Sequence, residues 1–350
     1  MELESLKFKN NVSNGLYENP FDQNAIETIL SGFYGKKLSI SGGKLSKIQT
    51  KNQLFQSNNL QHFKFENIQI NEAALVILLQ ALGQQENLKS LEFVQLNITT
   101  KNAEILIPLR QCSQLRSLKF DRFLIGTYES YEVVLRYLGP KIQEFTLIVH
   151  NAKSIDHVSD VISHFDSKII KSINLDVRNF IKNQDYLAST RQCLQILQYY
   201  TNLKKLSLHV GQILVNKLSY LLHIDKELLD PIGIGLLKFG AQLEELTLVT
   251  NYSGITPETN SKYNQTTISS YQEKNLHQQD SKLFDTFCLG LASCINLKFL
   301  NLPRDMLNMH FFDSYYKALD QNQVKSNLIR MSQVPLYKSC RPEICRSFLF

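Results

Sequence analysis

The stretches "LKSLEFVQLNI" (residues 88–98) and "LRSLKFDRFLI" (residues 115–125) place their apolar residues at the same positions, and their first leucines are 27 residues apart. Side chains along a β-strand point alternately to opposite faces. Leu91 and Phe93 therefore face a core, while Ser90 and Glu92 point away from it. The two stretches predict the same half-buried strand, repeated at a fixed interval.

The pattern recurs along most of the chain. Its first apolar residue, which we call the marker, occurs at Leu3, Leu60, Leu88, Leu115, Ile142, Ile170, Leu203, Leu243 and Leu297, with a degenerate copy near Leu38. From residue 60 to 170 the markers are 28, 27, 27 and 28 residues apart, and the later intervals lengthen to 33, 40 and 54. Self-similarity at this period indicates a repeat architecture, and the longer intervals indicate insertions into it.

Segments with helical spacing lie between the strands. Residues 71–83 and 189–200 each carry their apolar residues in one stripe. A strand and a helix in under 30 residues cannot bury their apolar faces alone, whereas stacked copies can. A doubly wound sheet is disfavoured, because it requires strands that are apolar on both faces. We therefore predict an α/β solenoid with a curved parallel sheet inside and helices outside.

This repeat resembles the leucine-rich repeats of the ribonuclease-inhibitor type, over roughly residues 1–310. The resemblance implies one strand and one full helix in each repeat. The family's usual Asn or Cys, eight residues after the marker, occurs only at Asn11 and Asn251. Elsewhere that position holds Ile68, Leu96, Phe123, His150 or Arg178. The backbone groups of the turns must then find other partners.

Three regions follow from the pattern. Residues 1–310 form one continuous repeat domain, residues 251–282 within it form a polar, aperiodic loop that we expect to be disordered, and residues 311–350 form a capping helix and a basic, apolar tail. The chain begins inside a strand pattern without an amphipathic cap. Solenoid ends require a cap, so we expect a partner or a preceding segment to cover this end.

Composition restricts the classes of function. The net charge is +6, but five basic residues and one acid lie beyond residue 322, so the rest of the chain is nearly neutral. General nucleic-acid binding is therefore not expected. No apolar stretch predicts a membrane span. Six cysteines in 350 residues and the absence of a secretory pattern favour the cytosol, with the cilium, the cytoskeleton and the nucleus as alternatives.

The motifs that suggest chemistry have simpler explanations. His157, Asp160 and His164 share one helix face at metal-ligand spacing, but the opposite face is apolar, so we interpret the polar face as solvated. Cys112 and Cys294 each lie three residues before a marker, which predicts core positions. The "SGGK" at 41–44 is typical of a turn, and "GIGLLKFG" at 233–240 lacks the spacing of a dinucleotide loop. We predict no catalytic residues, no cofactor and no metal.

The outward residues of the strands remain as the candidate site. They form a concave face of mixed charge, and two interpretations are open: a solvated sheet face without a partner, or a recognition surface of the kind that binds proteins. The predicted partner-binding residues are Lys64, Glu92, Lys119, Asp121, Glu144, Asn174, Asp176, Lys205, His209 and Glu245. The function predicted from them is that of a non-catalytic interaction module or scaffold subunit. The alternatives are a regulator or inhibitor of a small GTPase or nuclease, and the interaction portion of a longer enzyme such as a kinase.

The C-terminal residues generate a first prediction. Residues 308–322 predict a terminal helix that covers the last repeat, residues 327–337 a further strand, and residues 338–350 a tail that folds back onto the solenoid end. Deleting residues 337–350 should lower the melting temperature and promote aggregation, without weakening binding at the concave face. Unchanged stability together with lost partner binding would assign the tail to recognition instead.

Overall fold

The computed structural model describes the chain in fourteen segments. These are residues 5–9, 23–48, 54–55, 57–96, 103–123, 129–150, 158–178, 192–209, 211–216, 219–224, 226–249, 284–302, 309–322 and 330–332. The chain divides into two compact units. The N-terminal unit comprises residues 1–150 and 160–171, and the C-terminal unit comprises residues 151–159 and 172–350.

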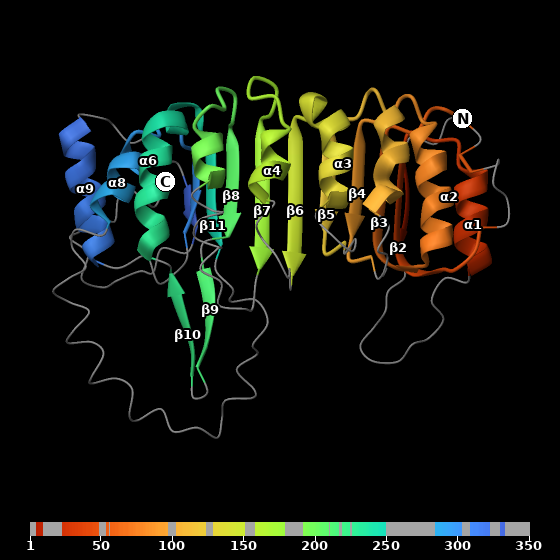
Figure 1. Ribbon diagram of the computed structural model, residues 1–350, viewed down its shortest axis with the longest axis horizontal. Coiled ribbons are helices and arrows are strands. Elements are labelled where there is room, and N and C mark those ends of the chain that lie inside the picture. Colours follow the sequence, from red (N-terminus) through yellow and green to blue (C-terminus); the bar gives the residue numbers. More distant parts are fainter. Residues whose placement is uncertain are drawn as a thin grey trace. The chain divides into compact units, whose positions relative to one another are not determined.

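The N-terminal unit is a parallel sheet with helices on one face (Figure 1). Its strands pair in chain order and in parallel: β1 (Ser5–Lys9), β2 (Lys37–Leu45), β3 (His62–Ile70), β4 (Ser90–Val94), β5 (Ser117–Asp121) and β6 (Glu144–His150). Its helical elements are α1 (Gln23–Gly32), α2 (Glu72–Gly83), the 3₁₀ helix η1 (Ala103–Gln111), α3 (Glu129–Leu138), the 3₁₀ turn η2 (Gly139–Lys141) and most of α4 (Val158–Ser163). The α/β class with a parallel sheet is thus confirmed.

The C-terminal unit repeats this plan with longer connections. The strands β7 (Ser172–Arg178), β8 (Lys205–His209), β11 (Glu245–Val249), β12 (Phe299–Asn301) and β13 (Arg330–Ser332) pair in parallel in that order. The helical elements are residues 192–197, α6 (Lys226–Phe239), η3 (Gly240–Gln242), α8 (Asp285–Ala292) and α9 (Met309–Asn322). One insertion forms an antiparallel hairpin, β9 (Gly211–Asn216) and β10 (Ser219–Ile224), which we did not anticipate from the sequence.

The strands pair in the register that the repeat predicts. Leu91 of β4 lies opposite Phe63 of β3 and Leu118 of β5, so equivalent residues of successive copies are neighbours. Leu91 and Phe93 are fully buried, whereas Glu92 between them is partly exposed. The alternation of side chains therefore sorts each strand into a core face and an open face, as predicted.

Aromatic side chains fill the core of the N-terminal unit. The Phe93 ring lies 6.5 Å from Phe63, 6.3 Å from Phe120 and 5.0 Å from Phe123, centroid to centroid. Rings at these separations contribute about 0.5–1.5 kcal/mol per pair beyond the area that they bury. Phe123 occupies the position where the resembled family has Asn or Cys, and it is 1% exposed. The apolar residue at this position therefore extends the core instead of hydrogen-bonding the turn.

Left-handed residues stand one position earlier, inside β2 and β3 and directly after β4 and β5. Gly42, Asn67, Gln95 and Arg122, each seven residues into its copy, have φ values of 80°, 54°, 53° and 51°. In this conformation the Gln95 N–H donates to the Asp121 carbonyl at 2.6 Å, and the Arg122 N–H donates to the Ile148 carbonyl at 2.7 Å. Backbone bonds to the next copy thus replace an asparagine ladder.

The prediction of a turn at residues 41–44 is wrong. These residues lie within β2, which pairs with β3 on both sides of Gly42, through Ser41 to Glu66 and through Gly43 to Ile68. Gly42 and Gly43 have φ values of 80° and 133°, which a glycine adopts without strain. The glycine pair therefore makes a bulge-like bend inside a strand.

The predicted helices are confirmed where the structure describes them, and α9 and β13 lie at the positions predicted for a terminal helix and a further strand. Residues 71–83 form α2, whose cap residue Asn71 accepts a hydrogen bond from the Ala74 N–H at 2.8 Å. Residues 192–197 are helical within the predicted 189–200. In α9 the Phe311 ring lies 6.0 Å from Phe284 and 6.3 Å from Phe287, and β13 forms within 327–337. The predicted loop at 251–282 and the tail at 338–350 lie outside the described residues.

Helices α6 and α8 approach each other through two glycines. A Cβ added to Gly233 would lie 2.4 Å from the Thr286 carbonyl oxygen, and one added to Gly290 would lie 2.3 Å from the Gly233 carbonyl oxygen. Both distances are far inside van der Waals contact, and both obstacles are backbone atoms that cannot rotate away. Gly233, the first glycine of "GIGLLKFG", therefore serves the packing of α6 on α8.

This contact generates a second prediction. Gly233→Ala and Gly290→Ala should each lower the free energy of unfolding by about 1–3 kcal/mol, because the added methyl group forces the two helices apart. Gly32→Ala is the matched control: its Cβ meets nothing within 4 Å, so stability should stay within about 1 kcal/mol of the wild type. Urea unfolding followed by circular dichroism measures both. Equal stability of all three variants would contradict the close packing of α6 on α8.

Candidate interaction surface

The open face of the N-terminal unit carries an ordered row of charges. Lys64 of β3, Glu92 of β4 and Lys119 of β5 are register partners on adjacent strands, which lie about 4.8 Å apart. All three side chains are partly exposed. Lys64 also contacts Glu66 of its own strand, with 3.1 Å between Nζ and Oε2. The structure thus brings three of the predicted residues together in a row of alternating sign.

The first residues of the strands form a neighbouring row, which contains a fourth predicted residue. Glu144, the first residue of β6, is exposed and lies opposite Ser117 of β5. It stands next to the Lys119 row because successive outward side chains of a strand are two residues apart. Four of the predicted residues are therefore accessible on this face.

Asp121 is part of the structure rather than of the open surface. Its side chain is buried, and its Oδ1 accepts a hydrogen bond from Arg122 Nε at 3.0 Å. With its amide oxygen turned towards the Arg122 guanidinium, Gln95 directs its amide nitrogen at Asn67 Oδ1. These left-handed residues therefore interlock at the carboxyl ends of the strands. The sequence analysis overlooked this position, although Gly42 and Asn67 are the residue types that favour a positive φ.

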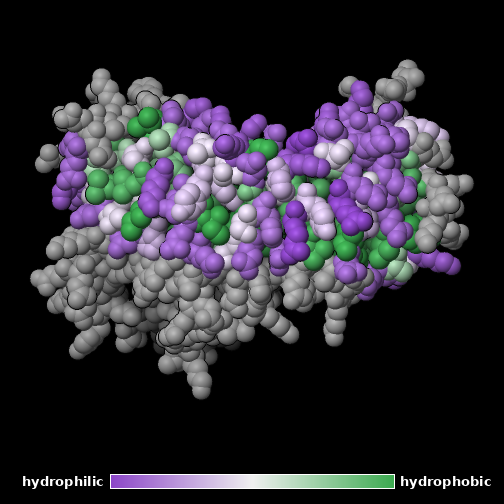
Figure 2. All heavy atoms as spheres, turned by 45° about the horizontal axis from the view of Figure 1, so that its top comes forward, coloured by the Kyte–Doolittle hydropathy of each residue, from purple (hydrophilic) through white to green (hydrophobic). Residues whose placement is uncertain are grey.

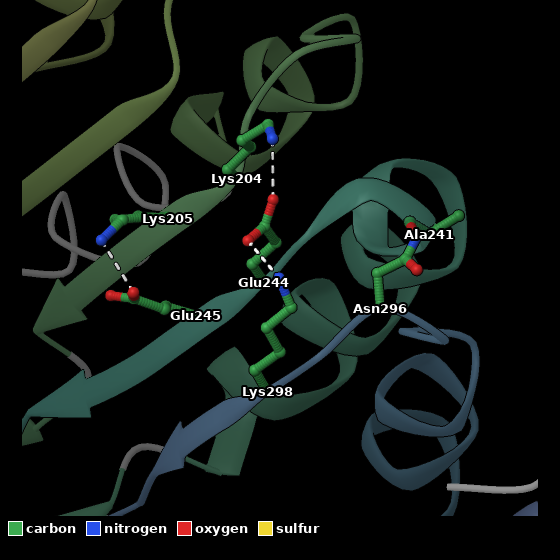
Figure 3. Close-up of polar contacts among 7 residues, drawn as sticks. All are labelled: Lys204, Lys205, Ala241, Glu244, Glu245, Asn296 and Lys298. Carbon is green, nitrogen blue, oxygen red and sulfur yellow. Dashed lines mark hydrogen bonds and ion pairs between the residues drawn. The ribbon is translucent and has the colours of Figure 1, made fainter. Parts of the chain in front are cut away.

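The open face of the C-terminal unit is less charged. Lys205 of β8 and Glu245 of β11 are register partners and form an ion pair at 2.7 Å (Figure 3). The next row consists of small neutral residues in register, namely Asn174, Ser207, Thr247, Asn301 and Ser332. Asp176 is buried. His209 ends β8 opposite Val249, and its side chain lies outside the described part of the structure.

A second ion-pair group lies just before the strands of this unit. Glu244 accepts a hydrogen bond from Lys204 Nζ at 2.7 Å on one carboxylate oxygen and from Lys298 Nζ at 2.8 Å on the other (Figure 3). These two bonds lower the pKa of Glu244 from 4.5 to about 2. The three residues belong to one column of the repeat, directly preceding β11, β8 and β12.

His62 lies under the influence of two lysines at the equivalent end of the N-terminal unit. Partial burial lowers the pKa of His62 below 6.5, and the charges of Lys37 and Lys89 lower it further, against the opposing effect of Glu92. The imidazole is consequently neutral at physiological pH. It contributes hydrogen bonding and shape to the face, while the lysines supply the charge.

The other candidate groups do not assemble a reactive site within the described residues. No group of three or more His, Cys, Asp or Glu in these residues could hold a metal ion. His164 Nε2 lies 3.8 Å from Glu132 Oε1 of α3, and His157 lies outside the described residues. Cys112 and Cys294 are buried as predicted, and burial raises the pKa of each thiol to about 12. Both thiols are therefore protonated and unreactive at physiological pH.

No protein-family model matches the chain, and no curated protein matches it in sequence. Among the described residues, no helix combines the length and the apolar character needed to cross a membrane. The proposal for function below is therefore argued from the fold and from the surface of the described residues.

The Glu244 group generates a third prediction. The folded-state pKa of about 2 lies below the ordinary 4.5, so the carboxylate stabilises the fold fully above about pH 4.5 and loses this effect as the pH falls towards about 2. Wild-type protein should therefore be more stable than Glu244→Gln at neutral pH, and the difference should shrink between about pH 4.5 and pH 2. Denaturant midpoints at several pH values measure it.

A double substitution provides the control for this prediction. Lys204→Gln combined with Lys298→Gln removes both donors. In that background Glu244→Gln should no longer change the pH dependence of stability. A wild-type advantage over Glu244→Gln that is the same at neutral and at acid pH would contradict the assigned cause of the pKa shift.

Proposed function

We propose that this chain is a non-catalytic protein-interaction module whose leucine-rich repeats, of the ribonuclease-inhibitor-like kind, form a solenoid and whose open sheet face binds a protein partner. The observation that carries the proposal is the in-register row of Lys64, Glu92 and Lys119. It presents charges of alternating sign at fixed spacing on a face that the described helices leave uncovered (Figure 1).

The pattern of the row favours a protein partner. A polyanion would require positive charges along the whole face, whereas the negative Glu92 stands between two lysines. A protein surface can present complementary acids and bases side by side, and such complementarity fixes the register of a complex and disfavours wrong partners. The C-terminal unit presents, on its own open face, a neutral polar row with hydrogen-bonding groups of the kind found in interface rims.

The repeat architecture supports the same assignment. Successive copies stack through parallel pairing in a constant register, so each adds one strand to a widening face. Extended faces of this kind are the binding surfaces of repeat proteins. We propose the cytosol as the location, because Cys112, Cys288 and Cys294 are free and buried, as expected where disulfides do not form.

A charge swap on the open face tests the proposal and constitutes a fourth prediction. Glu92→Lys combined with Lys119→Glu keeps the net charge but inverts part of the row. A tagged full chain with this swap should lose at least about five-fold of the partner recovered by the wild type from its native cells, because each juxtaposed like charge opposes binding. Quantitative mass spectrometry of the purified complexes measures the recovery.

The matched control swaps two exposed charges on α9, Asp313→Lys with Lys317→Asp. It should leave recovery unchanged. Equal recovery by the wild type and by both swaps would contradict binding through the open face. Recovery of the bait alone, at low and at high salt, would contradict the interaction module itself.

A further inference from the structure

The column of residues that directly precedes the strands differs in charge between the two units. In the C-terminal unit it holds Lys204, Glu244 and Lys298, and the glutamate binds both lysines (Figure 3). In the N-terminal unit the same column holds Lys36, Gln61, Lys89, Arg116, Gln143 and Lys171. These six residues, which precede β2 to β7, include four cations and no acid, whereas Glu4, which precedes β1 in the sequence, lies outside the described residues. We call these six residues the basic edge.

The contacts of the basic edge leave its charge uncompensated. Lys89 Nζ donates to Gln61 Oε1 at 3.2 Å, and Lys171 Nζ donates to Gln143 Oε1 at 3.1 Å. Arg116 donates to the carbonyls of Ser113 and Leu115. Among the described residues, no carboxylate pairs with any of the four cations. In the N-terminal unit, neutral amides and carbonyls therefore orient the cations. In the C-terminal unit, the carboxylate of Glu244 neutralises the cations of the equivalent column.

The surroundings of the basic edge keep this excess. The turns and first strand residues beside it contribute three positive charges, at Lys37, Lys141 and Lys168, and three negative charges, at Glu86, Glu144 and Asp166. These charges cancel, so the excess positive charge of the basic edge remains. The pKa of His62, the next residue after Gln61, is lowered by burial and then by Lys37 and Lys89. Figure 2, which turns the upper edge of Figure 1 forward, shows many hydrophilic side chains on that face, with apolar ones between them.

The geometry of the basic edge is a line rather than a broad surface. Its six residues are joined in a chain of backbone hydrogen bonds, in which each N–H donates to the carbonyl of the equivalent residue of the preceding copy. The chain starts with the Gln61 N–H and the Lys36 carbonyl and ends with the Lys171 N–H and the Gln143 carbonyl. Five strand-to-strand steps of about 4.8 Å span roughly 24 Å. An extended peptide of about seven residues, at about 3.4 Å each, covers that length.

We propose that the basic edge binds an acidic, extended peptide segment of a protein partner, with carboxylates that contact the four cations. This site is distinct from the open face, and the proposal does not depend on it. Gln61 and Gln143 direct their oxygens at lysines, which leaves their amide N–H groups to donate to the same peptide. Single-stranded nucleic acid is disfavoured, because its binding relies on bases stacked on aromatic side chains and the six positions hold none.

Titration of the full chain with a fluorescein-labelled octaglutamate peptide at low ionic strength tests this proposal. Anisotropy should report binding that weakens as salt is added. Lys89→Gln with Lys171→Gln should weaken binding roughly five-fold, since each exposed charge contact contributes modestly. The matched control, Lys9→Gln with Lys44→Gln, removes two exposed cations near the opposite ends of the strands. It should leave binding within about two-fold of the wild type.

Thermal melts of both variants should coincide with that of the wild type, which separates binding from folding. Equal losses in the two variants would assign the affinity to net charge and overturn the proposal, as would the absence of wild-type binding. Tighter binding to an octathymidylate strand or to phosphatidylserine vesicles than to the peptide would overturn the assignment to an acidic protein segment.

Discussion

The backbone hydrogen bonds between successive copies of the repeat are the constraint on which the rest of the structure depends. The Lys89 N–H donates to the Gln61 carbonyl at 2.7 Å, and the Ser90 N–H donates to the same oxygen at 3.0 Å. The same arrangement recurs before β11, where the Glu244 and Glu245 N–H groups share the Lys204 carbonyl. Each copy can thus satisfy its backbone only through a neighbour. Because the pairing is parallel and its register constant, every property of a strand position becomes a property of a whole column.

This column logic explains why the surfaces of the protein are linear. On the core side it produces the run of phenylalanines around Phe93, and on the open side it produces the charged row that contains Glu92. The column of residues at the starts of the strands has a different character in each unit. In the C-terminal unit it forms an ion-pair group around Glu244. In the N-terminal unit it forms the basic edge. A substitution at one position therefore changes one step of a row and leaves the others in place. Repeat proteins can accordingly alter recognition without altering their fold.

Two features show where prediction from single residues reached its limit. Asp121 was predicted to be an outward binding residue because of its place in the alternation, and it does point that way along β5. It is buried nevertheless, because the left-handed Arg122 folds its guanidinium back onto the carboxylate. The hairpin β9–β10 was not predicted either, because it lies in an interval where the repeat spacing is lost. Both differences arise where local backbone geometry departs from the regular strand that a period of two assumes.

The sequence by itself determined most of the repeat strands, their buried apolar residues and the order in which they stack. These depend on the alternation of apolar side chains and on the spacing of the markers, both of which are local properties of the chain. It also determined that Cys112 is a core residue. Only the tertiary structure decided how turns without an asparagine ladder are satisfied, which charges are paired, and that the Gly233 and Gly290 backbones touch. Those outcomes depend on distances between residues that are tens of positions apart, and such distances exist only once neighbouring copies have packed.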